Sequence, residues 1–202
     1  MSISSYNDSL PLLHRALRFT EMDFLGLKLA ELGNQRVKGY GPRMVSARAM
    51  YLFAGTEHTA FDINGRDGVV QQDLREQIDP SYYGKFDVVT NFGTSEHVGK
   101  RQIHQAMCFA NIHNLCRVEG VMVHYLPASG YCNGHGRFKY TPDFFNALAL
   151  ENDYRVFESS LLRKRHRAGR GNPRAVDYYV GAILRKRSAT VFSETFPQVP
   201  LE

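Results

Sequence analysis

Residues 154–184, YRVFESSLLRKRHRAGRGNPRAVDYYVGAIL, contain two runs of apolar, β-branched and aromatic residues with no helical segment between them. The runs 154–162 and 176–184 predict two strands. The connection, 163–175, has the glycines and the proline that are typical of a turn. The two strands should therefore pair as an antiparallel hairpin at one end of a sheet.

Upstream of this hairpin, short strand-like runs alternate with longer helical segments. This alternation is typical of an α/β fold built around a mostly parallel sheet. The segment from about 142 has the clearest helix start, with Thr141 as N-cap and Pro142 in the first helical position. The predicted strands cover residues 27–32, 58–63, 69–72, 86–91, 121–126, 154–162 and 176–184, and the predicted helices cover about 43–54, 100–117 and 142–152.

The composition indicates one globular domain. The chain has 202 residues, of which 43% are hydrophobic and 22% charged, so it can bury a sizeable core. Within 1–202 we expect an N-terminal helical cap (1–26), a core (27–187) and an extended tail (188–202). No run approaches the roughly 18 apolar residues of a membrane span, and no basic segment leads into an apolar run at the N-terminus. We therefore expect a cytoplasmic protein without a membrane partner.

The net charge of +5 has a local origin. Six basic residues and no acidic residue lie within residues 163–174, so the rest of the chain is close to neutral. The segment could attract RNA, an anionic sugar nucleotide or the acidic face of a partner protein. It could also be a solvated hairpin connection, where water screens the charges. It contains no aromatic residue for base stacking, which makes nucleic acid the weaker functional interpretation.

Three cysteines, Cys108, Cys116 and Cys132, form neither an even set nor a CxxC pair. A disulfide framework is therefore not expected, which suits a reducing compartment. Cys132 and His135 have a spacing found in zinc sites, but no second pair of ligands accompanies them. We predict no metal site.

Polar residues follow the first three predicted strands where each strand ends. In an open α/β sheet, ligands bind beyond the carboxyl ends of the strands. Gly33 would let a ligand lie against bare backbone, Asp62 could accept hydrogen bonds from both hydroxyls of a ribose, and Asp73 could take an exocyclic amine. The GxGxxG fingerprint for a pyrophosphate is absent after the first strand. A nucleoside cofactor without phosphates fits best.

These residues carry a resemblance to a known family. The order of Glu31-Leu32-Gly33, Asp62, Asp73-Leu74 and Phe86-Asp87-Val88-Val89 leading to Glu96-His97-Val98, closed by the hairpin, resembles the class I S-adenosylmethionine-dependent methyltransferases. The resemblance covers about residues 25–187. Small stand-alone members of the superfamily are resembled in the stretches 130–136, 140–145 and 152–154. The resemblance implies a Rossmann-like, seven-stranded, mostly parallel sheet of order 3-2-1-4-5-7-6, with an antiparallel terminal hairpin and helices on both faces.

The resemblance also assigns residues to the cofactor S-adenosylmethionine. Its methionine part would be bordered by Glu31, Gly33 and Asn34. Its ribose would be held by Asp62, with Ile63 beside the adenine, and the adenine would contact Asp73 and Leu74. The transferred methyl group would face Asn91 and Phe92.

The first loop departs from the family pattern. Gly33 stands alone where the family usually has two or three glycines, and the segment from Glu31 to Asp62 is longer than usual. The extra length predicts a loop that closes over the site. The shortage of glycine keeps open a noncatalytic alternative, in which a methyltransferase-like protein binds RNA or a protein partner through 163–175.

The resemblance implies methyl transfer. We expect a small-molecule or carbohydrate-like acceptor, methylated at oxygen, because the sequence shows no added recognition domain and residues 1–26 are long enough for a cap over the site. A hydroxyl acceptor needs a base, and imidazole titrates in the useful range. His135, in a glycine-rich loop, is the favoured candidate, and His97 is the second. His124 lies within a predicted strand and is better explained as a hydrogen-bonded core residue.

Competing interpretations apply to single residues. Asp62 could simply cap the turn at Asn64-Gly65, and Glu96 could be a residue favourable to the start of the following helix. In some methyltransferases a Glu-His pair at the place of Glu96-His97 binds a divalent metal, but no further ligand is visible here. A nicotinamide dehydrogenase would use Asp62 but would lack its phosphate loop, so this function ranks last.

Overall fold

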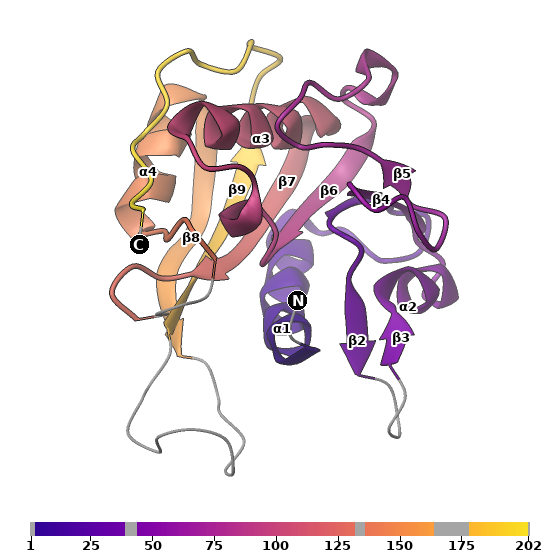
Figure 1. The fold of residues 1–202 in the computed structure, drawn as a ribbon. Coiled ribbons are helices and arrows are strands. Elements are labelled where there is room, and N and C mark those ends of the chain that lie inside the picture. Colours follow the sequence, from indigo (N-terminus) through magenta and orange to yellow (C-terminus); the bar gives the residue numbers. More distant parts are fainter. Residues whose placement is uncertain (1–2, 39–43, 132–135, 164–177, 202) are drawn as a thin grey trace.

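The computed structural model describes residues 3–38, 44–131, 136–163 and 178–201 (Figure 1). Its centre is a seven-stranded sheet in the order β5-β4-β1-β6-β7-β9-β8. The strands are β1 (Lys28–Leu32), β4 (Glu57–Asp62), β5 (Val70–Gln71), β6 (Phe86–Phe92), β7 (Cys116–Pro127), β8 (Tyr154–Arg163) and β9 (Tyr178–Lys186).

The direction of the strands matches the expected plan. Strands β5, β4, β1, β6 and β7 run parallel, whereas β9 pairs antiparallel with both β7 and β8. Counted along this sheet, the order is 3-2-1-4-5-7-6 with an antiparallel terminal hairpin, so the predicted fold class is confirmed. The parallel strands end at one edge, where polar side chains from separate loops come together.

Helices cover both faces of the sheet (Figure 1). On one face lie α1 (Ile3–Thr20) and α2 (Ala47–Phe53), and on the other α3 (Gln102–Leu115) and α4 (Pro142–Glu151). Two short 3-10 helices, η1 (Pro80–Tyr82) and η2 (Ser95–His97), lie in loops. The α4 start is as predicted, because Thr141 Oγ1 accepts from the Phe144 N–H at 3.1 Å.

Each face has its own core. Leu12, Leu13 and Ala16 of α1 are buried against Val123 and Ile183 of the sheet. On the opposite face, α3 and α4 pack through a set of aromatic residues. The alternation of side chains along each strand supplies both cores, because successive residues point to opposite faces. The predicted N-terminal helix therefore packs on the sheet.

Two local predictions were wrong. The segment after β1 forms a hairpin, β2 (Arg36–Lys38) with β3 (Met44–Ser46), so the helix predicted over about 43–54 begins only at Ala47. Val37 is buried in the α1 core, so β2 packs toward α1. In addition, β7 begins at Cys116, five residues before the predicted start at 121, because α3 ends at Leu115.

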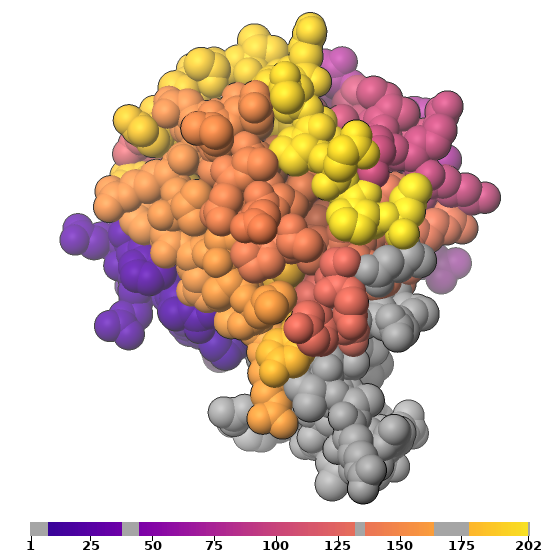
Figure 2. Space-filling model, turned by 90° about the vertical axis from the view of Figure 1, so that its left-hand side faces the viewer, coloured from indigo at the N-terminus to yellow at the C-terminus, as the bar shows by residue number. Residues whose placement is uncertain are grey.

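The extended tail lies across α3 and α4. In Figure 2 the C-terminal residues, in yellow, run beside the orange surface to which α4 belongs. The Ser193 N–H donates to Asn152 Oδ1 at 2.8 Å, and the Val199 N–H donates to Gln102 Oε1 at 3.2 Å. Further on, the Lys139 N–H donates to the carbonyl of Pro200 at 3.1 Å. The tail thus connects α4, the start of α3 and the segment that follows residue 136.

None of the helices in the described residues combines the length and the apolar character that crossing a membrane would require.

Candidate cofactor and acceptor cleft

A cleft of about 930 Å³ opens where the parallel strands end, in the size range typical of small-ligand sites. Its walls come from the loops after β1, β4, β5 and β6 and from the start of α3. The structure brings together seven residues that the sequence predicted for the site. They are Gly33, Asn34, Asp62, Ile63, Asp73, Leu74 and His97.

The first turn of the cleft is built on Gly33. This residue has φ +83°, and its N–H donates to the Phe61 carbonyl at 2.8 Å. A Cβ at this position would lie 2.6 Å from Thr94 Oγ1 and 2.8 Å from Gln35 Nε2. Only glycine fits both the backbone conformation and the space. The turn therefore presents bare backbone to the cleft.

Gln35 and Thr94 close this turn and were not predicted. Gln35 is buried, and its Nε2 donates to the Leu32 carbonyl at 3.2 Å and to Thr94 Oγ1 at 3.1 Å. Thr94 Oγ1 donates to the same Leu32 carbonyl at 2.8 Å. Side-chain hydrogen bonds thus hold a loop that has a single glycine. In the described part of the segment from Glu31 to Asp62, the β2–β3 hairpin and α2 do not line the cleft, whereas Phe61 and Asp62 at the end of β4 do. Residues 39–43, in the loop predicted to close over the site, lie outside the described residues.

Asp62 stands at the end of β4 with its carboxylate fixed. Oδ2 accepts from the Asn34 N–H at 2.7 Å, and Oδ1 accepts from the Asn64 N–H at 2.9 Å. The turn-capping role is therefore present. Each carboxylate oxygen has a second lone-pair direction, so the same group retains capacity for two hydroxyl donors. Ile63, 62% exposed, adds apolar surface beside it.

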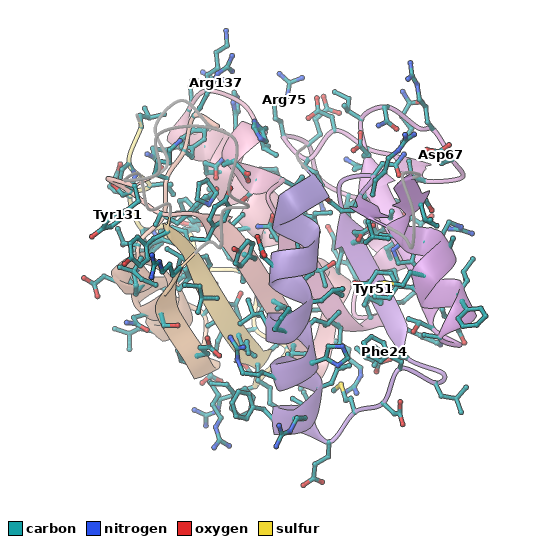
Figure 3. The ribbon with its side chains drawn as sticks, turned by 90° about the horizontal axis from the view of Figure 1, so that it is seen from below. Phe24, Tyr51, Asp67, Arg75, Tyr131 and Arg137 are labelled. Carbon is teal, nitrogen blue, oxygen red and sulfur yellow. The ribbon has the colours of Figure 1, made fainter. Side chains whose placement is uncertain are left out.

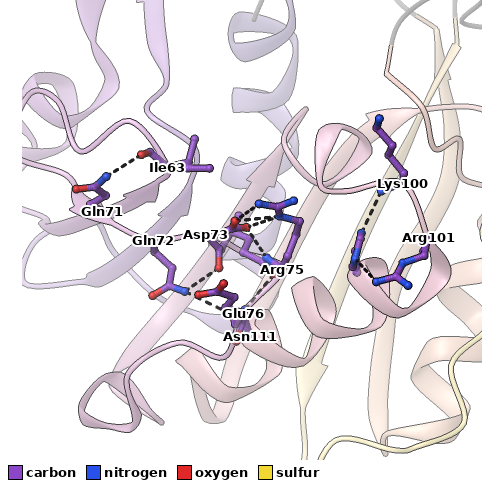
Figure 4. Close-up of polar contacts among 11 residues, drawn as sticks. Ile63, Gln71, Gln72, Asp73, Arg75, Glu76, Lys100, Arg101 and Asn111 are labelled. Atoms are coloured by element: carbon purple, nitrogen blue, oxygen red, sulfur yellow. Dashed lines mark hydrogen bonds and ion pairs between the residues drawn. The ribbon is translucent and has the colours of Figure 1, made fainter.

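Asp73 and Leu74 form the wall after β5. Leu74 is buried at the base of this wall, and Asp73 makes an ion pair with Arg75 (Figure 4). The hydrogen bond from the Arg75 side chain lowers the pKa of Asp73 below its usual value. Asp73 is thus a carboxylate that is already partly neutralised by a neighbouring cation.

Three other predicted residues lie beneath the cleft and do not line it. Asn91 and Phe92 are both buried on β6, and Phe92 belongs to the α1 core. Glu31 is 1% exposed, and its Oε2 lies 3.3 Å from Nε2 of the buried His58. Burial raises the pKa of Glu31, against the opposing effect of His58. These residues are buried because both faces of β1 and β6 are covered, so side chains on either face lie in the interior.

The structure confirms that His124 is a core residue. It is fully buried, its ring lies 4.9 Å from the Phe145 ring, and its Nδ1 is 3.3 Å from Asn91 Nδ2. Burial lowers the pKa of His124 to about 3, so the imidazole is neutral at physiological pH.

The loop after β6 places a second Glu-His pair at the cleft. Glu96 has a fully buried side chain, whereas that of His97 is 49% exposed, with Nε2 3.6 Å from Glu96 Oε1. A Cβ at Gly136 would fall 2.5 Å from Glu96 Cγ, so the segment from 136 packs directly on this pair. His135, the favoured base, lies outside the described residues, as do Cys132 and most of 163–175.

The remaining wall is cationic and was not predicted. Lys100, Arg101 and His104, at the start of α3, line the cleft together with Arg75 and Arg137. Figure 3 looks from below Figure 1 and shows the labelled side chains of Arg75 and Arg137 at the same end of the molecule. In the sequence, the only sign of this cationic wall was the adjacent pair Lys100-Arg101. The sequence does not show that this pair faces Asp73 across the cleft. Within the described ranges, no cluster of three or more metal-ligating side chains occurs.

Comparison with solved structures identifies proteins of the same architecture. A Burkholderia thailandensis 1,6-didemethyltoxoflavin-N1-methyltransferase, solved with bound 1,6-didemethyltoxoflavin and S-adenosylhomocysteine, matches at a TM-score of 0.59 and 18% identity, over 88% of this chain and 77% of the other. The 16S rRNA (adenine(1408)-N(1))-methyltransferase from Catenulisporales acidiphilia matches at a TM-score of 0.51 and 10% identity, over 87% and 93%. The StiE O-MT matches at 0.53 and 12%, over 88% and 74%.

No protein-family model matches the sequence. No curated protein matches it either. At these identities the structural matches establish the architecture and leave the reaction open. The sheet order, the antiparallel terminal hairpin and the matching structures agree: the chain has the class I S-adenosylmethionine-dependent methyltransferase fold.

Proposed function

We propose that this protein transfers a methyl group from S-adenosylmethionine to a small-molecule or carbohydrate-like acceptor, at oxygen. The observation that carries the proposal is the cleft at the carboxyl edge of the sheet, where the Gly33 turn, Asp62 and Leu74 meet. These groups fit a nucleoside that has no phosphate. Bare backbone meets its amino-acid part, a carboxylate with spare lone pairs meets its ribose, and Ile63 and Leu74 meet its base.

S-adenosylmethionine supplies a methyl group on a positively charged sulfur, which a nucleophile takes in a single displacement. The protein's main task is therefore to align the acceptor and to exclude water. The loop after β6 supplies the near wall through Thr94 and His97, and the segment from Gly136 packs beside it.

His97 is the described residue best placed to take the proton of an acceptor hydroxyl. Its imidazole reaches the cleft, while the buried Glu96 carboxylate behind it stabilises the positive charge that protonation creates. His135 stays a second candidate because it precedes Gly136, which packs on Glu96. The side chain of Glu96 is fully buried, and the low dielectric of such a site strengthens the interaction with the charged ring.

A product assay tests this function. The full chain is incubated with S-adenosylmethionine and pools of hydroxyl-bearing small molecules, and S-adenosylhomocysteine is quantified by mass spectrometry. We expect product only in pools that contain an acceptor, and less of it with His97→Ala. Product formation with RNA and with none of the small-molecule pools would contradict the proposed acceptor class. An absence of product with every acceptor, together with no binding of S-adenosylhomocysteine, would favour the noncatalytic alternative.

A further inference from the structure

The lining of the cleft has more cations than carboxylates, by four to two. The cations are Arg75, Lys100, Arg101 and Arg137, and the carboxylates are Asp62 and Asp73. Two positive charges therefore remain in excess. Walls of low dielectric strengthen the field of such an excess inside a cleft.

The excess is concentrated on one wall. Arg75 is paired with Asp73, and the Asp62 carboxylate accepts two backbone N–H groups. By contrast, the ion pairs formed within the described part of the chain do not include Lys100, Arg101 or Arg137. Figure 4 shows the Asp73–Arg75 pair apart from Lys100 and Arg101. The Lys100 N–H and Arg101 Nη2 both lie within hydrogen-bond distance of the His104 ring.

His104 is fixed in one orientation and one tautomer. The Lys100 N–H donates to Nδ1 at 3.1 Å, and the ring packs so closely on Gly99 that a Cβ there would lie 2.1 Å from Nδ1. Because Nδ1 accepts this hydrogen bond, Nε2 must carry the proton of the neutral ring. A side chain at the third helical position that reaches back to a preceding backbone N–H also stabilises the start of α3.

This tautomer places two donors against each other. His104 Nε2 lies 3.2 Å from Arg101 Nη2, and the arginine nitrogen also carries hydrogen. Neither group has an acceptor lone pair for the other. An anionic oxygen beside both would satisfy the two donors at once, and Lys100 and Arg137 would add charge on the same side of the cleft.

We propose that Lys100, Arg101, His104 and Arg137 form a phosphate subsite for the methyl acceptor, an inference that rests on the proposed function. The donor S-adenosylmethionine has no phosphate, so the group belongs to the acceptor. A phosphate monoester carries about −1.5 to −2 charges at neutral pH, which matches the excess of two cations. Its three terminal oxygens suit a site that combines arginine forks, an ammonium group and an imidazole N–H. The acceptor class is therefore a phosphorylated small molecule.

The test is a calorimetric titration of inorganic phosphate into the full chain saturated with S-adenosylhomocysteine. We expect saturable binding that Arg101→Gln weakens by about tenfold or more, because a charge-assisted hydrogen bond is lost. The same substitution should leave the affinity for S-adenosylhomocysteine unchanged. Lys85→Gln is the matched control, since Lys85 is exposed, carries the same charge and lies outside the cleft lining. This control should bind both ligands as the unmodified chain does.

The possible failures are distinguishable. If S-adenosylhomocysteine binds and phosphate does not, or if Arg101→Gln binds phosphate as tightly as the unmodified chain, the subsite is wrong and the proposed function stands. If phosphate binds and S-adenosylhomocysteine does not, the methyltransferase function is wrong and the anion site stands. Acetate that competes as well as phosphate would overturn the phosphate assignment. Tighter binding of the dinucleotide UpU would overturn the small acceptor in favour of an RNA backbone.

Discussion

The chain contains two Glu-His pairs of similar geometry and different surroundings. Glu31 and His58 lie 3.3 Å apart with both side chains buried, whereas Glu96 and His97 lie 3.6 Å apart with the histidine side chain 49% exposed. The first pair is enclosed by core residues, including Tyr51, whose ring stacks on that of His58 at 5.0 Å. The second opens into the cleft.

The two pairs differ in their access to the cleft, and we propose that this difference separates their roles. A buried imidazole cannot exchange protons with a substrate. Its removal lowers the stability of the fold, because packing contacts are lost. A half-exposed imidazole contributes little to packing and can reach a ligand. We therefore assign the Glu31–His58 pair to stability and the Glu96–His97 pair to chemistry, and four substitutions test this division.

The largest expected effect is on folding. His58→Ala should lower the free energy of unfolding by about 3 kcal/mol, because it leaves a cavity beside Tyr51 and removes the partner of Glu31. Urea unfolding followed by circular dichroism measures this change. His97→Ala, the matched control, should change the same quantity by less than about 0.5 kcal/mol. Equal losses of unfolding free energy in the two variants would contradict the assignment of the two pairs to different roles.

His97→Ala should lower turnover by about 10²-fold, because a positioned base is lost. The rate is measured as release of S-adenosylhomocysteine with the acceptor found by screening. Binding of S-adenosylhomocysteine itself should not change. A variant that keeps full turnover would assign the proton transfer elsewhere, with His135 as the next residue to substitute.

Glu96→Gln sharpens the assignment of the second pair. The substitution keeps the volume of the buried side chain and removes the charge that stabilises a protonated His97. Turnover should fall by about tenfold, since the lost interaction is charge-assisted. The KM for the acceptor should stay the same, which separates this effect from disturbed packing. A raised KM with unchanged kcat would make Glu96 a structural residue.

The smallest effect concerns the pH dependence of stability. Burial raises the pKa of Glu31 above its ordinary value of 4.5, so the folded chain holds a proton that the unfolded chain releases. This carboxyl therefore makes the protein less stable as the pH rises from about 4.5 toward the folded pKa. The glutamine in Glu31→Gln cannot ionise. The unfolding free energy of this variant should therefore rise relative to that of the unmodified chain as the pH increases over that interval. A constant difference from pH 4 to 8 would contradict the assignment.

The sheet could be predicted because its signals are local. Runs such as 86–91 and 154–162 are apolar and β-branched, and the missing helix before 176–184 dictates a hairpin. The β2–β3 hairpin could not be predicted, because its strands are only three residues long and are stabilised by packing on α1. Likewise, the early start of β7 depends on where α3 ends.

The site was predictable only where strand ends determine it. Gly33, Asp62 and Asp73 meet because parallel strands end at one edge, a consequence of the strand order. The cationic wall depends on how the segment from Gly99 to His104, which includes the start of α3, is placed along the cleft, and no periodicity encodes this placement. Glu31 and Phe92 were assigned by their place in the sequence, yet both are buried because β1 and β6 are covered on both faces of the sheet.

The most direct test of the central claim is a calorimetric titration of S-adenosylhomocysteine into the full chain, into Asp62→Ala and into the control Asp143→Ala. Asp143 is exposed on α4 and does not line the cleft. We predict micromolar binding to the unmodified chain and the control, and binding weaker by about tenfold or more in Asp62→Ala, because charge-assisted bonds to two hydroxyls are lost. The same affinity in all three proteins, or no binding in any of them, would contradict the claim that this cleft holds the cofactor.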